Sequence, residues 1–143
     1  MPKKTASVVN KSDVGKPKKL ILIVDDEFDL TSTFSLLFQL NGFETFTANN
    51  GQHALELIRQ RVPDLILSDY MMPIMDGMQL SQQLRADPAT AHIPIILMSA
   101  IPQHEDMITS RFSAFIQKPF QFKHLLEITL RTLSSQDTGK TVP

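Results

Sequence analysis

Apolar runs that end abruptly in a charged residue constrain the fold of this chain more than any other feature. Three of them are 20–24 before Asp25 and Asp26, 65–68 before Asp69, and 112–117 before Lys118. Short, nearly continuous apolar runs are typical of strands that are buried on both faces of a parallel sheet. We therefore expect several buried strands, each delivering a charged side chain at its carboxyl end.

Segments with helical periodicity separate the predicted strands. Strands are predicted over 20–24, 43–47, 65–68, 93–98 and 112–117, and the polar alternation in 43–47 is typical of a sheet edge. Helices are predicted over 27–40, between Gly51 and Pro63, between Asp76 and Asp87, over 104–111, and from Phe122 onward. The inner face of the last helix is predicted to carry Phe122, Leu125, Leu126, Thr129, Leu130 and Leu133. Five strand–helix alternations predict a doubly wound α/β fold, (βα)5, with a parallel sheet covered on both faces.

The 143 residues suit one domain, which we place at 19–135. Residues 1–19 hold six lysines and one aspartate, so we predict a disordered basic tail over 1–18, with a contact to an acidic partner or nucleic acid as the alternative. No aromatic residue interleaves these lysines, which argues against nucleic acid. Residues 136–143 are predicted to be a flexible tail. With no cysteine, no secretory signal and no apolar run of the ~20 residues that span a bilayer, we expect no membrane contact and a cytoplasmic location.

The predicted strand ends bring carboxylates together and therefore call for a cation. Ligands in a doubly wound sheet bind outside the carboxyl ends of the strands, where Asp25, Asp26 and Asp69 would meet. Oxygen ligands without histidine or cysteine select a hard ion, and Mg²⁺ is the natural candidate. We expect Asp26 and Asp69 to bind it directly, Asp25 to bind through water, and the backbone carbonyl of Met71 to supply a further oxygen.

With Mg²⁺ in place, Asp69 can act as a nucleophile in phosphoryl transfer. The loose transition state mainly needs positive charge and hydrogen-bond donors on the phosphoryl oxygens. The Lys118 ammonium supplies charge, and the Ser99 hydroxyl can donate to another oxygen. The product would be an acyl phosphate on Asp69, whose added negative charge could draw Ser99 inward and shift its loop.

These residues closely resemble those of the response regulator receiver domain of two-component signalling, the chemotaxis-regulator-like family. The resemblance rests on Asp25-Asp26, on the stretch from Asp64 to Asp69 with Pro73 and Asp76-Gly77, on Ser99-Ala100, and on Lys118-Pro119-Phe120. It covers about residues 19–135. It implies a flavodoxin-like fold with strand order 2-1-3-4-5 and a phosphoryl donor that is a phosphohistidine on a sensor histidine kinase or histidine phosphotransfer protein. It also implies a cis Lys118-Pro119 bond and a switch pair formed by Ser99 and Phe115.

The sequence thus favours a single-domain response regulator, a signalling phospho-acceptor and not an enzyme with an external substrate, whose output runs through an unknown downstream protein. The alternative is a receiver-like scaffold module that binds its partner constitutively. An unrelated Mg²⁺-dependent phosphatase would need a second acid at Met71, and there is none. Met71 and Ile101 stand where relatives with fast self-dephosphorylation often carry acid or amide groups, so we predict a long-lived phosphoryl group. The segment between Ser99 and Phe112 is shorter than usual for the family, which predicts a trimmed fourth helix.

Overall fold

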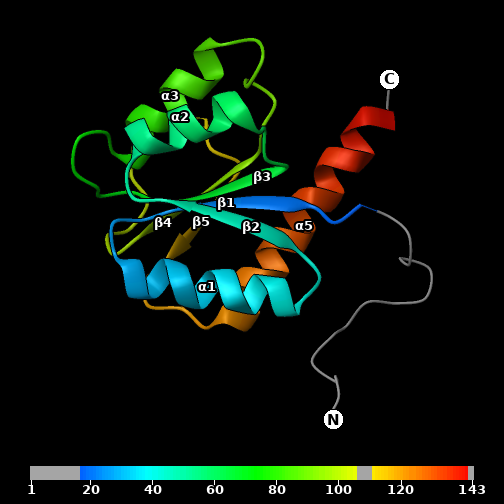
Figure 1. Cartoon of the computed structure of the whole chain (residues 1–143), viewed down its shortest axis with the longest axis horizontal. Helices are drawn as coiled ribbons and strands as arrows, with labels where there is room; N and C mark the ends of the chain where they lie inside the picture. Colours follow the sequence, from blue (N-terminus) through cyan, green and yellow to red (C-terminus); the bar gives the residue numbers. More distant parts are fainter. Residues whose placement is uncertain (1–16, 106–110, 142–143) are drawn as a thin grey trace.

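The computed structural model describes residues 17–105 and 111–141, with side chains up to residue 136. Five strands form one parallel sheet: β1 (Leu20–Val24), β2 (Glu44–Ala48), β3 (Leu65–Asp69), β4 (Ile95–Ser99) and β5 (Ala114–Gln117). Their order is β2-β1-β3-β4-β5, which confirms the predicted flavodoxin-like α/β fold. Helices α1 (Phe28–Leu40) and α5 (Phe122–Thr141) cover one face, and α2 (Gly51–Gln60) and α3 (Gly77–Ala86) cover the other (Figure 1).

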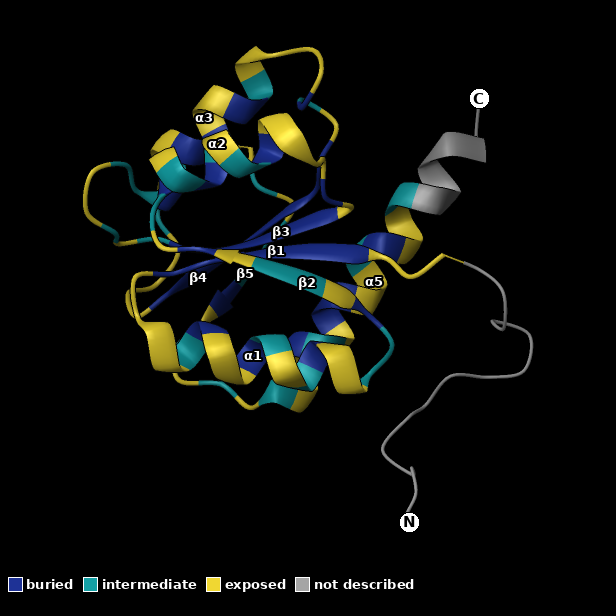
Figure 2. Cartoon of the chain, viewed as in Figure 1, coloured by how far each residue is buried: buried dark blue, intermediate teal, exposed yellow. Residues whose placement is uncertain are grey.

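The continuous apolar runs arise because the central strands are covered on both faces. Side chains alternate between faces along a strand, so Ile21 and Ile23 of β1 pack in the core under α1 and α5. Leu22 and Val24 pack in the core under α2 and α3. All five residues of β1, β3 and β4 are buried, while β2 at the edge is half-exposed, as predicted (Figure 2).

The helix ends follow the local sequence closely. Asp76 caps α3 in a capping box, in which its side chain accepts from the Gln79 N–H and the Gln79 side chain accepts from the Asp76 N–H. The Asn50 side chain caps α2 by accepting from the His53 N–H. Gly42 follows α1 with a φ of 91°, a left-handed conformation that glycine adopts without strain. These devices set where each helix starts or stops relative to the sheet.

Some predicted boundaries and one predicted core residue are wrong. Strand β4 begins at Ile95 and not at residue 93, because Pro94 has no N–H to donate to the ladder, and β5 begins at Ala114 and not at residue 112. Helix α5 runs to Thr141 and so extends into the tail over 136–143, whose predicted flexibility stays a prediction. Leu130 is 50% exposed, since it lies five residues after the buried Leu125, roughly 140° around a helix of 3.6 residues per turn.

The part of the chain that the structure describes contains no helix long and apolar enough to cross a membrane. The predicted basic tail falls almost entirely on residues outside that part, as does most of the short helix predicted over 104–111. Both therefore stay predictions.

Candidate functional site

The sheet register places the functional side chains together at the carboxyl ends of the strands. In the parallel ladder Val24 pairs with Ser68, and Ser99 pairs with Gln117, so β1, β3, β4 and β5 end nearly level. The residues that follow these strands are therefore neighbours in space. One carboxylate oxygen from each of Asp25, Asp26 and Asp69 lies within 4.8 Å of the other two. The convergence of the three acids, expected from the strand ends alone, is present in the fold.

Lys118 joins the last strand to this acidic cluster. Its Nζ lies 2.9 Å from Oδ1 of Asp69 and 3.5 Å from Oδ2 of Asp25. The backbone N–H of Lys118 donates to the carbonyl of Ser99 at 2.7 Å, which fixes the start of the lysine side chain against β4. The Lys118-Pro119 peptide bond is cis, as the family resemblance implied. Burial lowers the pKa of Lys118, but the hydrogen bond and charge of Asp69 outweigh it and raise that pKa, so the lysine carries its positive charge at neutral pH.

Asp25 is the most deeply buried acid of the cluster and has one unsatisfied oxygen. Its side chain is almost fully enclosed, and burial raises its pKa to about 6, although its hydrogen bond from the Glu27 N–H opposes this. Its Oδ2 has no hydrogen-bond partner among the described residues, the 3.5 Å contact with Lys118 being an ion pair only. A buried oxygen of this kind, beside two other carboxylates, fits a hard divalent cation such as Mg²⁺.

Asp69 and Asp26 differ in how much water they meet. Asp69 is buried, and this burial raises its pKa, while the hydrogen bond and charge of Lys118 lower it. Asp26 is exposed, so it can reach an ion from the solvent side. The site therefore brings together three different acids: Asp25 is buried, Asp69 is paired with Lys118, and Asp26 is exposed to solvent. This donor set suits an ion that keeps several of its own waters.

Ser99 lies at the end of β4 and is fully buried. Its Oγ accepts a hydrogen bond from the Ile101 N–H at 3.0 Å, which leaves the hydroxyl proton free for another acceptor. Phe115, predicted to switch with Ser99, is half-buried and its ring packs 6.3 Å from that of Phe112. The switching role of the pair stays a prediction, as does the Met71 carbonyl as a metal ligand. The Met71 and Ile101 side chains are exposed at this edge, 66% and 43% respectively.

Gly77 is a site-positioning residue that sequence reasoning treated only as a helix start. A Cβ on it would lie 2.4 Å from the carbonyl oxygen of Asp69 and 2.8 Å from Cδ1 of Leu97. Its N–H donates to the carbonyl of Tyr70 at 2.9 Å, and the Tyr70 N–H donates to the carbonyl of Met98 at 2.8 Å. Only glycine allows α3 to start this close to the strand that carries Asp69. The Asp-Gly pair indicates a turn, but nothing in the sequence indicates how closely Gly77 approaches the backbone of Asp69.

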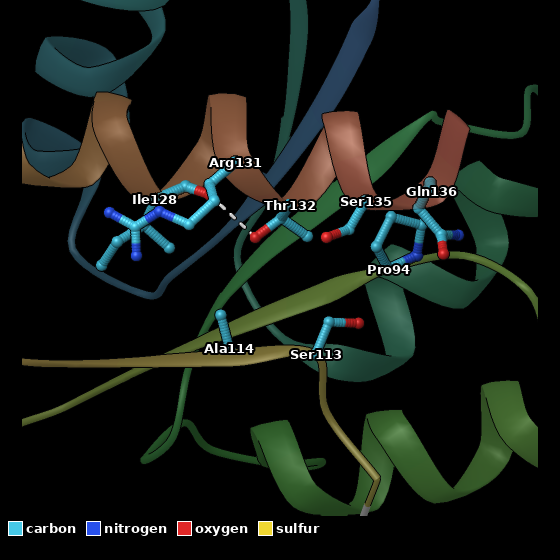
Figure 3. Close-up of a pocket in the computed structure, with 8 residues that line it drawn as sticks. All are labelled: Pro94, Ser113, Ala114, Ile128, Arg131, Thr132, Ser135 and Gln136. Atoms are coloured by element: carbon cyan, nitrogen blue, oxygen red, sulfur yellow. Dashed lines mark hydrogen bonds between the residues drawn. The ribbon is translucent and has the colours of Figure 1, made fainter. Parts of the chain in front are cut away.

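A separate hollow of about 260 Å³ lies at the opposite end of the sheet. Figure 3 shows it between α5 and the amino ends of β4 and β5, where Thr132 and Ser135 point toward Ser113 and Ala114. None of the predicted site residues lines it. The residues of α5 that line it beyond Ile128 are polar, namely Arg131, Thr132, Ser135 and Gln136.

Known proteins are similar to this chain in sequence. The model of the response regulator receiver domain matches residues 21–130. The regulatory protein AtoC of Escherichia coli is 39% identical over 125 residues, which cover 85% of this chain and 27% of that protein. The polar-differentiation response regulator DivK of Brucella anthropi is 32% identical over 114 residues, which cover 78% of this chain and 92% of that protein.

Solved structures of receiver domains and response regulators have a similar fold. The signal receiver domain of a signal transduction histidine kinase from Syntrophus aciditrophicus matches with a TM-score of 0.76 at 31% identity, covering 82% of this chain and 91% of that chain. The chemotaxis response regulator CheY4 of Vibrio cholerae matches with a TM-score of 0.77 at 25% identity, covering 81% and 99%. This chain spans 27% to 53% of the length of the first three curated relatives it matches.

Proposed function

Because this chain belongs to the family of response regulator receiver domains, which are the signalling phospho-acceptors of two-component systems, we propose that it accepts a phosphoryl group on Asp69. The observation that carries the proposal is the Lys118 ammonium, held 2.9 Å from Asp69 beside two further carboxylates. A lysine paired only for stability would need one acid. Three acids around one lysine leave excess negative charge that a divalent cation would balance.

Mg²⁺ would be held by Asp25, Asp26 and Asp69, together with the Met71 carbonyl and waters. When bound, the ion would neutralise charge on the phosphoryl oxygens and orient the donor. The unsatisfied, buried Oδ2 of Asp25 supports this assignment, since a buried carboxylate oxygen without a partner is costly. Receiver domains as a family bind Mg²⁺ at such an acidic pocket.

Asp69 would act as the nucleophile in an in-line displacement. A carboxylate oxygen forms a bond to phosphorus while the nitrogen–phosphorus bond of the donor phosphohistidine breaks, and the bonding pair stays on the imidazole nitrogen. The Lys118 ammonium, already beside Oδ1 of Asp69, needs only a small shift to contact a phosphoryl oxygen. The Ser99 hydroxyl donates its free proton to another oxygen once it turns from the loop toward the phosphoryl group.

The donor would be a sensor histidine kinase or a histidine phosphotransfer protein, and the output a change in binding to a downstream protein. Asp69, Ser99 and Lys118 carry the transfer, and Ser99 with Phe115 would carry the change of state. The receiver domain would act as a regulator that turns over no external substrate. The constitutive scaffold module remains the second candidate, but no contact among the residues that the structure describes favours it.

Acetyl phosphate, a small phosphodonor, tests the proposal directly. Incubated with Mg²⁺ and read by intact mass, the wild type should gain one phosphoryl group, and Asp69→Asn should gain none. Asp76→Asn is the matched control, because it makes the same chemical change at an acid that caps α3 and should leave phosphorylation intact. A wild type that gains no phosphoryl group, or an Asp69→Asn variant that still gains one, would contradict the proposal. A pull-down with and without a phosphoryl mimic then separates a switch from a constitutive module.

A further inference from the structure

Two aromatic rings join the loops that follow β3 and β4. The Tyr70 ring, one residue after Asp69, meets the His104 ring edge-on, with centroids 6.1 Å apart and planes at 71°. Tyr70 lies between β3 and α3, whereas His104 lies in the segment after β4, five residues beyond Ser99. The contact therefore ties the loop that carries the hydroxyl donor to the strand end that carries the nucleophile.

The two sides of this contact are anchored very differently. Both backbone polar groups of Tyr70 are hydrogen-bonded. Its N–H donates to the Met98 carbonyl, and its carbonyl accepts from the Gly77 N–H. Beyond Ser99, residues 100–103 are all exposed, and His104 is the first residue to turn back against the domain. The position of Tyr70 is therefore fixed by its backbone hydrogen bonds, and His104 is the residue through which the loop after Ser99 contacts it.

We propose that His104 is a positioning residue, whose contact with Tyr70 holds the Ser99 loop in its unphosphorylated place. The inference rests on the proposed function, in which the Ser99 hydroxyl turns from the loop toward the phosphoryl group. The Ile101 N–H is hydrogen-bonded to the Ser99 Oγ at 3.0 Å, so a displacement of the hydroxyl is passed to the loop that ends at His104. Moving the loop separates the rings, and the contact therefore opposes the phosphorylated state.

The size of the effect follows from linkage. Suppose the ring contact forms only while the loop keeps its present position. It then favours that position by some factor, and it weakens the binding of a phosphoryl group by the same factor. An edge-to-face aromatic pair of this kind is worth about threefold to tenfold in such an equilibrium. Removing the contact should therefore tighten the binding of a phosphoryl analogue by about threefold to tenfold.

Beryllofluoride, a non-covalent phosphoryl analogue, provides the measurement. Titrated calorimetrically into the Mg²⁺-loaded protein, it should bind His104→Ala and Tyr70→Leu about threefold to tenfold more tightly than the wild type. The double variant should gain no more than either single one. Tyr70→Phe keeps the ring and should bind as the wild type does. His124→Ala removes an imidazole on the exposed side of α5 and should also bind as the wild type does.

Proton NMR supplies a readout that general destabilisation would not move. The His104 ring protons, identified by their loss in His104→Ala, should show a ring-current shift from Tyr70 that disappears when beryllofluoride saturates the wild type. A shift that persists at saturation, or His104→Ala affinity equal to that of the wild type, would overturn the inference alone. A wild type that fails to bind beryllofluoride with Mg²⁺ would contradict the proposed function, and the inference with it.

Discussion

The Lys118 Nζ lies 2.9 Å from Oδ1 of Asp69, so the last strand of the sheet is electrostatically tied to the central one. The same ammonium also faces Asp25 at 3.5 Å. One cation thus stands between two buried acids whose pKa values burial raises. The charge that offsets these acids in the resting protein is the charge that would later contact the phosphoryl group.

Lys118→Met keeps the apolar stem of the side chain and removes its charge. We expect the rate of phosphorylation by acetyl phosphate to fall about 100-fold, as when a donor to a developing anion is removed. A time course by intact mass measures it, with Lys123→Met on the exposed side of α5 as control. A Lys118→Met rate within a few fold of the wild type would show that the ammonium does not contact the transferring group.

The stability of the protein should depend on pH in opposite ways with and without Mg²⁺. The pKa of Asp25, raised to about 6 from an ordinary 3.8, means that the folded state binds a proton more tightly than the unfolded chain. Without metal, the free energy of unfolding should therefore fall as pH rises from 4 to 6, by up to about 3 kcal/mol. With Mg²⁺, which needs ionised ligands, stability should instead rise over this range.

Urea unfolding at pH 4 and pH 6, in EDTA or in Mg²⁺, measures both trends. Other groups also titrate in this window, so the comparison is with Asp25→Asn, which removes this ionisation. The variant should lose part of the metal-free slope and much of the stabilisation by Mg²⁺. Equal slopes in the wild type and the variant would rule out Asp25 as their source.

The phosphoryl group on Asp69 should be long-lived, because the side chains beside it cannot orient an attacking water. Met71 and Ile101 are exposed at the site edge and carry no polar group. Introducing amides with Met71→Asn and Ile101→Gln should speed dephosphorylation about tenfold or more. The decay is followed by intact mass in Mg²⁺ after the donor is removed. Val62→Asn, an exposed apolar residue before β3, serves as control. Fast decay in the wild type would defeat the explanation.

Ile74 has a strained backbone conformation, and replacing it with glycine should stabilise the protein. It has a φ of 70° and is 79% exposed, so it makes few contacts that offset a left-handed backbone. Such a conformation costs an L-residue about 1–2 kcal/mol, and Ile74→Gly should raise the free energy of unfolding by about 1 kcal/mol. Urea denaturation tests this, with Ile101→Gly as a control that removes an exposed apolar side chain and should bring no gain. A loss of stability in Ile74→Gly would mean that the Ile74 side chain makes a stabilising contact.

The sequence was informative where a short local pattern decides the outcome. Buried parallel strands must be apolar along their length, and their ends must face one crevice, so Asp69 and Lys118 could be placed together from spacing alone. The strand order came from the family resemblance, because alternation of strands and helices does not fix it. The edge position of β2 followed from the polar alternation of its residues.

The sequence was uninformative where the outcome depends on long-range packing. The sequence does not show that Asp25 is buried, where it accepts from the Glu27 N–H, while the adjacent Asp26 is exposed. The exposure of Leu130 depends on how α5 is rotated against the sheet. The meeting of Tyr70 with His104 joins two loops that are 34 residues apart in the chain, and no local pattern signals it.

Tyr70 has a practical consequence. The chain contains one tyrosine and no tryptophan, and that tyrosine directly follows Asp69 with both backbone polar groups bonded. Nearly all of the native ultraviolet emission of the protein therefore originates at one point of the molecule. Metal loading and phosphoryl arrival can be timed in a stopped-flow instrument on the unlabelled protein, without a dye that would disturb the crevice.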